Sequence, residues 1–289
     1  MGTRTGTHTG AARRYVHGYS EDETRRLGDQ ADTLAALLHD GTAYPPGSRV
    51  LEAGCGVGAQ TVHLAASSPG ADVVAVDVSA ASLARAHARL TALSPVPAAG
   101  GLSAGAGRVE FVRADLHALP FADAEFDHVF VCFVLEHLPD PAAALAAVRR
   151  VLRPGGTITV IEGDHGSAFF HPDSAAARAA IGHLVRLQGA AGGDALLGRR
   201  LQPLLSAAGF ERVEVRPRTV YADRTRPTLM EGFTRATFIA MVAAVRDAAV
   251  AAGLTDPGSF DRGIADLEAT AREGGTFHYT FVKGVAVNP

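Results

Sequence analysis

The sequence predicts an α/β fold, a Rossmann-like doubly wound sheet of seven strands that are mostly parallel, with an antiparallel last strand and a helical lid. Two observations indicate this fold. Between residues 48 and 164, five short apolar runs alternate with stretches of helical pattern, as in a parallel sheet that is buried on both faces. An acidic residue also stands at or just beyond the end of each run: Glu52, Asp77, Asp115, Glu136 and Glu162. Because such sheets bind ligands beyond the carboxyl ends of their strands, we expect a binding site there.

The first half of the chain supplies the parallel strands. Residues 20–40 favour a helix, because Ser20 and Glu23 can form a capping box ahead of leucines at helical spacing. The Pro/Gly/Ala-rich residues 94–107 are expected to form a long loop. Strands are expected at 48–54, 71–79, 108–116, within 126–138 and at 157–164, with helices at 60–68, 81–93 and 140–152.

The second half of the chain departs from this alternation. Strands are expected at 210–220 and 276–287, and helices at 173–191, 194–208, 228–252 and 257–272. Two late strands separated by helices suit an antiparallel pair at the sheet edge, with the helices covering the binding site. We therefore expect a disordered tail at 1–10, an N-terminal helical cap at 11–44, and one domain at 45–289 with lid insertions around 166–208 and 222–273.

Composition excludes several classes of partner. The formal net charge is −3, so no broad basic surface for nucleic acid or an anionic membrane is expected. No window approaches the roughly 18 apolar residues of a membrane span. Cys55 and Cys132 lie in apolar or glycine-rich contexts, which favours reduced, buried thiols in a cytoplasmic protein over a nucleophile. No H-x-x-x-H, C-x-x-C or carboxylate triad is present, so no metal is predicted.

Residues 50–58, VLEAGCGVG, form the most informative motif. The glycines Gly54, Gly56 and Gly58 differ in spacing from the G-x-G-x-x-G fingerprint of dinucleotide-binding proteins. Glu52, directly before the turn, is a poor neighbour for a pyrophosphate and a good one for an ammonium group. Asp77 closes the second apolar run, where a ribose hydroxyl pair is the expected partner. A ligand that carries both an α-amino group and a ribose would satisfy both carboxylates.

Five motifs in order resemble the class I S-adenosylmethionine-dependent methyltransferases: VLEAGCGVG, VVAVDVS, FVRADLHALPF, FDHVFVCFVLEHL and LRPGGTITVIEGD, within residues 45–165. The resemblance implies that Asp77 accepts from both ribose hydroxyls, that Asp115 accepts from the adenine amino group, and that the backbone at Leu116 meets the ring. It is closest to the small-molecule branch of the family. The cofactor-binding residues expected on this basis are Tyr19, Glu52, Gly54, Gly56, Asp77, Val78, Asp115, Leu116, Phe133 and His137. Phe133 is equally compatible with a core position, and His137 with a structural role.

The methyl acceptor is less well defined by the sequence. The candidates for a catalytic base are Glu162, Asp164 and His165, just past the fifth expected strand, with His171 further along. Loop-capping roles are equally compatible with Asp164 and His171. The second half is rich in aromatic residues and contains only one lysine, Lys283, which favours an uncharged, apolar acceptor.

We therefore expect methyl transfer to a small, largely apolar metabolite at O, N or C, with C-methylation of a prenylated or aromatic compound among the options. The alanine- and arginine-rich composition is typical of a GC-rich genome, where such an enzyme suits secondary metabolism. A cofactor-binding protein without turnover and an NAD(P)-dependent reductase are the alternatives. The glycine spacing and the absence of a Y-x-x-x-K pair disfavour the reductase.

The segment from Tyr15 to Gln30 is expected to close over the cofactor. It precedes the first strand, so it lies outside the sheet, and it carries Tyr15, His17 and Tyr19 ahead of an amphipathic helix. A tyrosine over the sulfonium would add a cation–π contact. The alternative is a helix that covers a sheet edge or contacts a second subunit, which would make the protein a homo-oligomer.

Overall fold

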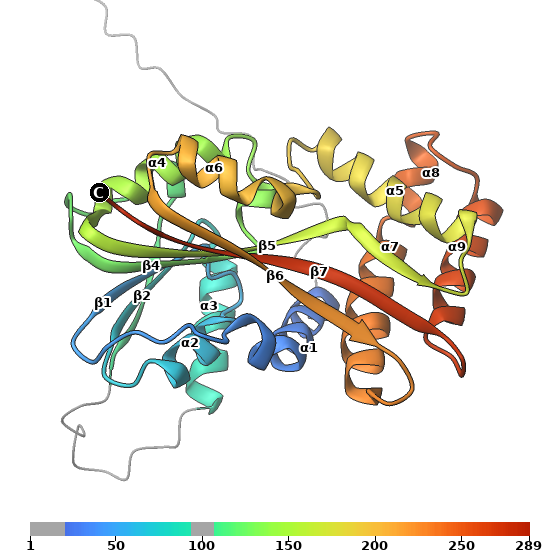
Figure 1. The fold of residues 1–289 in the computed structure, drawn as a ribbon, viewed down its shortest axis with the longest axis horizontal. Helices are drawn as coiled ribbons and strands as arrows, with labels where there is room; N and C mark the ends of the chain where they lie inside the picture. The colour runs from blue at the N-terminus through green and yellow to red at the C-terminus, as the bar shows by residue number, and fades with distance from the viewer. Residues whose placement is uncertain (1–20, 94–106) are drawn as a thin grey trace, which may run out of the picture.

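The computed structural model describes residues 21–93 and 107–289 (Figure 1). The expected tail at 1–10, Tyr15, Tyr19 and nearly all of the expected loop at 94–107 lie outside these residues. The side chains of residues 21–25 are also outside the description.

Seven strands form one sheet, in the order β3-β2-β1-β4-β5-β7-β6. The first five are parallel to one another, and β7 is antiparallel to both of its neighbours. The predicted fold class is therefore confirmed. The strands are β1 (Arg49–Ala53), β2 (Asp72–Asp77), β3 (Val109–Arg113), β4 (Phe126–Cys132), β5 (Leu152–His171), β6 (Glu211–Ala222) and β7 (Thr276–Val287).

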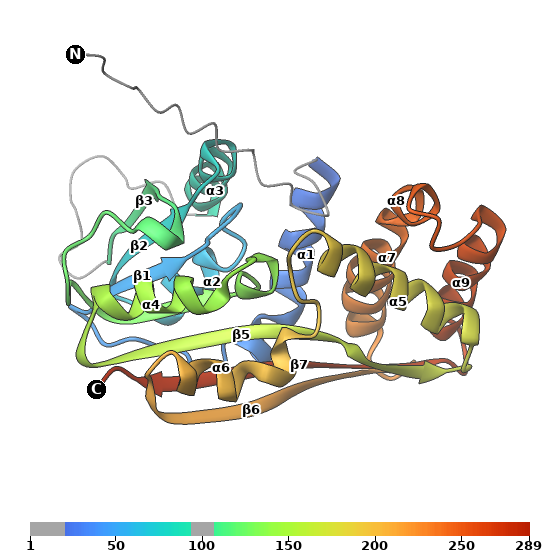
Figure 2. The same cartoon turned by 90° about the horizontal axis from the view of Figure 1, so that it is seen from above.

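Helices cover both faces of this sheet, as the continuous apolar runs of its strands require (Figures 1 and 2). On one face lie α1 (Glu21–Leu38), α2 (Thr61–Ser67) and α3 (Ala80–Leu93), and on the other α4 (Pro141–Val151) and α6 (Leu201–Ala207). Helix α4 begins where expected, because the Asp140 side chain accepts a hydrogen bond from the Ala143 amide and Pro141 occupies the first turn.

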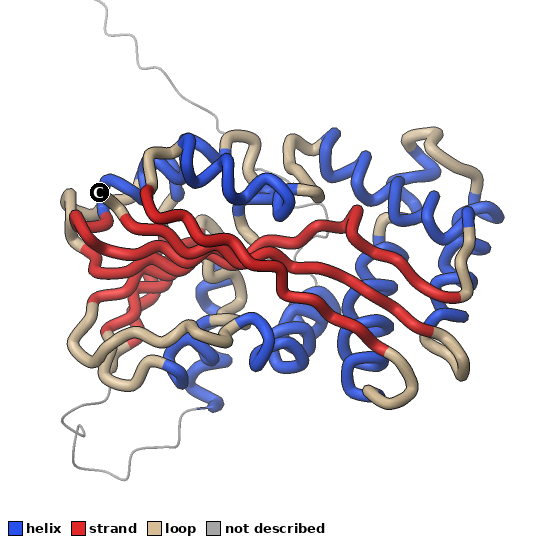
Figure 3. Tube along the Cα trace, in the orientation of Figure 1, coloured by secondary structure: helices blue, strands red, loops and turns tan. Residues whose placement is uncertain are grey.

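The fifth strand is much longer than the sequence indicates. The expected strand ends at residue 164, whereas β5 continues to His171 because β7 pairs with it as far as Thr276. The pairing is irregular between Asp164 and Phe169. Strands β5, β6 and β7 thus extend beyond the parallel sheet and carry helices at their far end (Figure 3). These helices are α5 (Ala175–Ala190), α7 (Ala240–Ala244), α8 (Arg246–Ala251) and α9 (Pro257–Thr270), and η3 (Leu197–Arg200) precedes α6.

The helix expected at 228–252 is divided into three pieces, and the first, η4 (Leu229–Ile239), is a π-helix. The Thr237 hydroxyl donates to the Gly232 carbonyl five residues earlier, at 2.7 Å. Gly232 faces helix α1, where an added Cβ would lie 2.3 Å from the Thr33 hydroxyl. Absence of a side chain at this position therefore allows η4 and α1 to pack closely. π-Helical turns are rare and occur frequently at functional sites.

Candidate active site

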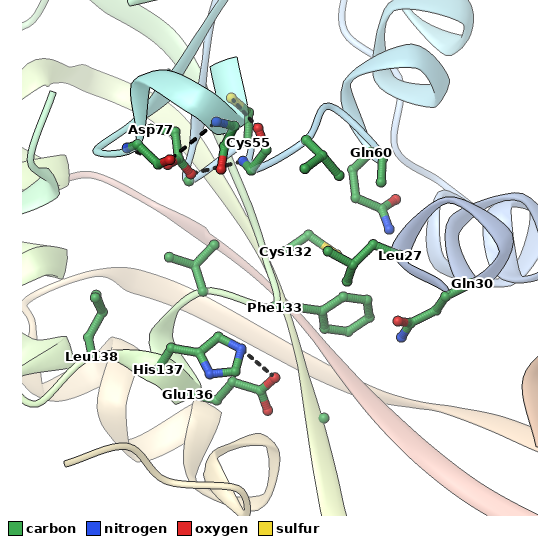
Figure 4. Close-up of a pocket in the computed structure, with 18 of the residues that line it drawn as sticks. Leu27, Gln30, Cys55, Gln60, Asp77, Cys132, Phe133, Glu136, His137 and Leu138 are labelled. Carbon is green, nitrogen blue, oxygen red and sulfur yellow. Dashed lines mark hydrogen bonds and ion pairs between the residues drawn. The ribbon is translucent and has the colours of Figure 1, made fainter. Parts of the chain in front are cut away.

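A cavity of about 930 Å³ opens at the carboxyl ends of the parallel strands. Four of the five acidic residues predicted at this edge line it: Glu52, Asp77, Asp115 and Glu136. Figure 4 shows Asp77 and the glycine turn on one side of Phe133, and Glu136 with His137 on the other. Helix α1 and the π-helix η4 contribute the opposing walls. The volume is at the upper end of the range for ligand pockets, so it has room for two small molecules.

The glycine turn is built around positive φ angles and close contacts. Gly54 has a φ of 82°, and a Cβ there would lie 2.6 Å from a Val134 methyl group. The space at Gly54 is thus filled by Val134. Gly58 has a φ of 74°, and its Cβ would lie 2.8 Å from the Ala86 side chain in α3. Glycine is required at both positions because any side chain would meet strain and a clash.

Asp77, at the end of β2, ties the glycine turn to the next helix. Its Oδ2 accepts from the Gly56 amide at 2.9 Å, and its Oδ1 accepts from the Ser79 amide at 2.8 Å. Burial raises the pKa of Asp77, while these backbone hydrogen bonds lower it. Each carboxylate oxygen can accept further hydrogen bonds. Both oxygens of Asp77, which lines the cavity, can therefore accept further hydrogen bonds from a ligand.

Glu52 is buried on β1, and its Oε2 has no hydrogen-bond partner among the residues that the structure describes. Burial, with a smaller contribution from the nearby Asp77 carboxylate, raises the pKa of Glu52 to about 7, although an interaction with the Thr61 side chain lowers it in part. A carboxylate held in this state gains from a cationic ligand, because a positive charge would offset its desolvation. The site thus favours an ammonium group beside the glycine turn.

The other predicted cofactor residues lie around the same end of the cavity. Asp115 caps the short helix η1 (Leu116–Ala118), accepting from the His117 amide at 2.9 Å. Val78 and Leu116 add apolar side chains to the lining of the cavity, and Val78 is 57% exposed. Phe133 has a φ of 57°, an uncommon value for a residue other than glycine, and its ring lies 5.3 Å from that of Phe281.

His137 and Glu136 lie in the short helix η2 (Leu135–His137), on the cavity wall away from the glycine turn. His137 Nε2 is 3.3 Å from Glu136 Oε1. Burial raises the pKa of Glu136 well above its ordinary value, and the Glu162 carboxylate raises it further. Both effects favour the protonated form of the Glu136 carboxyl group.

Helix α1 lines the cavity through Arg26, Leu27 and Gln30. The sequence placed the segment that includes these residues near the cofactor, but it did not single them out. The C-terminal end of α1 is held on the sheet by Lys283 of β7, whose Nζ donates to the carbonyl oxygens of Leu38 at 3.1 Å and Asp40 at 2.7 Å. This anchor fixes the helix against the sheet.

Two of the three candidate bases have other partners. Both Glu162 oxygens accept backbone hydrogen bonds, from Val134 at 3.1 Å, Leu135 at 2.8 Å and Glu136 at 3.4 Å. Asp164 forms a two-bond ion pair with Arg199, at 2.7 and 2.9 Å. Neither residue lines the cavity. Their geometry assigns them to positioning the β4–η2 connection and the lid. His171 is exposed at the end of β5.

His165 is the candidate base that does line the cavity. It lies in the irregular stretch of β5, where its amide donates to Ala195 of the lid at 2.9 Å. Its Nδ1 lies 2.7 Å from the hydroxyl oxygen of Tyr279 on β7. Tyr279 also lines the cavity, and the sequence named it only among the aromatic residues of the second half. Tyr279 occupies one of the alternating buried positions along β7, and that alternation could have identified it as an inward-facing residue.

Other expectations concern cysteine, metals and membranes. Cys55 and Cys132 are free and buried, as predicted, and burial raises the pKa of both thiols. Within residues 21–93 and 107–289, no cluster of three or more His, Cys, Asp or Glu side chains is arranged to hold a metal ion. Across the same part of the chain, no helix combines the length and apolar character needed to cross a membrane.

Comparisons with known proteins identify the family. Residues 51–160 match the family described as "Methyltransferase domain". The chain is 30% identical to the O-methyltransferase cnsE of Penicillium expansum over 221 residues, which cover 74% of this chain and 70% of that protein. The chain belongs to the class I S-adenosylmethionine-dependent methyltransferases. Its cofactor is S-adenosylmethionine.

A second curated relative and one solved structure are also similar to this chain. The demethylmenaquinone methyltransferase of Clavibacter sepedonicus is 36% identical over 49% of this chain and 55% of that protein. The chain thus spans about half the length of several curated relatives that it matches. Among solved structures, the [4+2]-cyclase SpnF is similar, with a TM-score of 0.52 and 23% identity over 90% of this chain and 81% of SpnF. That likeness shows the fold alone.

Proposed function

We propose that this methyltransferase transfers the methyl group of S-adenosylmethionine to a small, largely apolar metabolite in secondary metabolism. The observation that carries the proposal is that one cavity joins two chemically different ends. One end presents Glu52, Asp77 and Asp115, and the other is walled by Phe233, Phe238, Tyr279 and Phe281. A single cavity allows donor and acceptor to meet inside the protein.

The residues at the acidic end fit the cofactor. The unpartnered Glu52 Oε2 suits the α-ammonium group, and the two Asp77 oxygens suit the two ribose hydroxyls. Asp115 suits the adenine amino group, with Val78 and Leu116 against the ring. Bound there, the cofactor supplies an electrophilic methyl group. The protein must then hold the acceptor in line with that methyl group and exclude water from the cavity.

The aromatic end supports an apolar acceptor. Its rings come from the lid and from β7, which places them opposite the cofactor residues of the parallel sheet. Relatives whose names identify small-molecule acceptors, among them the demethylmenaquinone methyltransferase, support the same class. The acidic net charge of −3 is poorly suited to a nucleic-acid substrate. The cavity leaves O-, N- and C-acceptors open at this level.

Binding and turnover need separate tests, because the methyltransferase-like fold also occurs in a protein described as a cyclase. We expect S-adenosylhomocysteine to stabilise the protein, by about 2.7 kcal/mol at 100 times its dissociation constant. NADH and NADPH should leave the unfolding temperature unchanged. Stabilisation by a nicotinamide cofactor alone would contradict the proposal. Transfer of labelled methyl groups to a panel of metabolites then separates an enzyme from a cofactor-binding protein without turnover.

Replacement of Asp77 tests the ribose contact. We expect Asp77→Ala to weaken S-adenosylhomocysteine binding by about 1–3 kcal/mol, because two ligand hydroxyls and the Gly56 amide lose a charged acceptor. Isothermal titration calorimetry measures the change. Asp72→Ala is the matched control, since Asp72 begins the same strand, is exposed, and does not line the cavity. Equal affinities for Asp77→Ala and the wild type would mean that the ribose binds elsewhere.

A further inference from the structure

Three polar side chains converge at the aromatic end of the cavity, around Gly163 of β5. A Cβ at Gly163 would lie 2.5 Å from the Tyr279 hydroxyl oxygen, 3.5 Å from Glu136 Oε2 and 3.7 Å from His165 Cε1. These groups come from β7, η2 and β5. The absence of a side chain at Gly163 is what allows them to approach one another.

Glu136 presents an unsatisfied carboxyl oxygen within this cluster. Glu136 is 6% exposed, and its Oε2 has no hydrogen-bond partner within the part of the chain that the structure describes. His165 is also 6% exposed, and its ring lies perpendicular to that of Phe238 with centroids 6.1 Å apart. A buried polar atom without a partner costs stability, so its retention beside a ligand cavity indicates a ligand partner.

The aromatic rings around the cluster pack against one another. Ring centroids are 5.5 Å apart for Phe233 and Tyr279, 5.4 Å for Phe238 and Tyr279, and 4.7 Å for Tyr279 and Phe281. These rings therefore form a continuous apolar wall. An uncharged flat ring suits such a wall, whereas an ammonium ion would lose its hydration there.

We propose that Glu136, His165 and Tyr279 bind the reacting group of the acceptor, and that this group is a phenolic or enolic hydroxyl on an otherwise apolar compound. The inference rests on the proposed methyl transfer and narrows its acceptor. His165 is the base, and Tyr279 is a positioning residue. In the tautomer with its proton on Nδ1, His165 donates to the Tyr279 hydroxyl oxygen at 2.7 Å, and Nε2 is the basic nitrogen.

The methyl transfer needs only the acceptor hydroxyl, His165 and the methyl group of S-adenosylmethionine. The hydroxyl oxygen forms a bond to the methyl carbon as the carbon–sulfur bond breaks, and the sulfur keeps that electron pair. The hydroxyl proton passes to His165, which later releases it to solvent. The acidity of the hydroxyl favours a phenol or enol, since a phenol lies only about 3.5 pKa units above histidine. Histidine can also act as a general base on an aliphatic hydroxyl, as in serine hydrolases, so the preference for a phenol or enol is one of degree, and the aromatic wall of the cavity adds to it.

The charged neighbours of the cluster are compatible with a neutral acceptor. Besides burial, the charges of Glu162 and Asp194 raise the pKa of Glu136, and the charge of Arg26 in α1 lowers it. Asp164, next to His165 in the chain, is paired with Arg199. In the protonated form, the Glu136 carboxyl group can donate to the acceptor oxygen while His165 accepts the hydroxyl proton.

The test uses naphthol as the probe, with naphthylamine, decanol and methylnaphthalene as matched analogues. In the complex with S-adenosylhomocysteine, we expect calorimetry to give naphthol about tenfold tighter binding than methylnaphthalene, the effect of one good hydrogen bond. With labelled S-adenosylmethionine, label should enter naphthol as its methyl ether. Equal binding of naphthol and methylnaphthalene, or label in naphthylamine or decanol in preference to naphthol, would overturn the inference.

Variants separate catalysis from structure. We expect His165→Gln to lower kcat for naphthol by about 10²–10⁴-fold, with the affinity for S-adenosylhomocysteine unchanged. Tyr279→Phe should lower kcat less and leave KM nearly unchanged, because it misorients the base without removing it. His278→Gln and Tyr221→Phe are the controls. His278 stacks on the exposed Phe169, and Tyr221 is 39% exposed, so neither lines the cavity.

Two outcomes distinguish the inference from the proposed function. If S-adenosylhomocysteine binds and no probe accepts a methyl group, the acceptor class is wrong and the cofactor site stands. If S-adenosylhomocysteine does not bind, the methyl-transfer proposal fails. Full activity of His165→Gln on naphthol would show that His165 is not the base.

Discussion

Glu52→Gln is expected to stabilise the protein without ligand and to weaken cofactor binding. The wild-type carboxylate is buried with one oxygen unpartnered among the described residues, and burial raises its pKa to about 7. A neutral amide avoids the cost of that buried charge, so unfolding by urea at pH 8 should show a gain of about 3 kcal/mol. Loss of the charged partner for an ammonium group should weaken S-adenosylhomocysteine binding by about 1.5–3 kcal/mol.

The direction of the pH dependence follows from the raised pKa. Between the ordinary pKa of a glutamate, 4.5, and about 7, the folded protein holds a proton on Glu52 that the unfolded chain loses. Glu52 therefore destabilises the fold increasingly as the pH rises through this window, and its effect is constant above it. The stability difference between Glu52→Gln and the wild type should be about 2 kcal/mol larger at pH 8 than at pH 5.

Glu110→Gln is the matched control for this prediction, because Glu110 is exposed on β3. It should change neither unfolding nor cofactor affinity. A Glu52→Gln protein that is less stable than the wild type at pH 8 would mean that the interaction of Glu52 with the Thr61 side chain stabilises the fold by more than the buried charge costs. Unchanged affinity for S-adenosylhomocysteine would remove Glu52 from the cofactor site.

Glu162→Ala is expected to destabilise the protein by about 3 kcal/mol, because it leaves three backbone amides at the end of β4 without their acceptor. The amides belong to Val134, Leu135 and Glu136, and the last two residues are buried. The same change should loosen Phe133 and η2, so the affinity for S-adenosylhomocysteine should fall as well. Urea unfolding followed by circular dichroism measures the stability, with an unchanged slope as the check on two-state behaviour.

Glu110→Ala provides the baseline for an exposed glutamate, and its effect should stay within about 0.5 kcal/mol. A Glu162→Ala protein of wild-type stability that loses only turnover would contradict the positioning role given to Glu162. Glu162 would then be a catalytic residue, as the sequence suggested, and its hydrogen bonds to the backbone would contribute little to stability. Loss of stability together with cofactor affinity supports the positioning role.

The parallel half of the fold was predictable because its signals are local. Strands β1, β2 and β4 are short and largely buried runs rich in apolar residues, and such runs are found where both faces of a sheet are covered. The length of β5 was not predictable. Residues 165–171 contain glycine and polar residues, and they are extended because β7, more than a hundred residues later in the chain, pairs with them.

The π-helix η4 depends on tertiary packing in the same way. Its sequence, LMEGFTRATFI, has a helical pattern that does not distinguish one turn geometry from another. The wider turn is stabilised where Gly232 meets Thr33 of α1 and where Phe233 and Phe238 pack with Tyr279. These contacts join segments that are distant in the chain.

The sequence by itself determined the cofactor end of the site. Glycines that need positive φ angles and an acid that ends a buried strand are local features, so Gly54, Glu52 and Asp77 could be recognised from their order alone. Only the tertiary structure decided the acceptor end. It directed Glu162 to backbone amides and Asp164 to Arg199, and it brought His165 to Tyr279, 114 residues away. Side chains on an extended strand alternate between faces, so an irregularity in pairing decides which of them reaches the cavity.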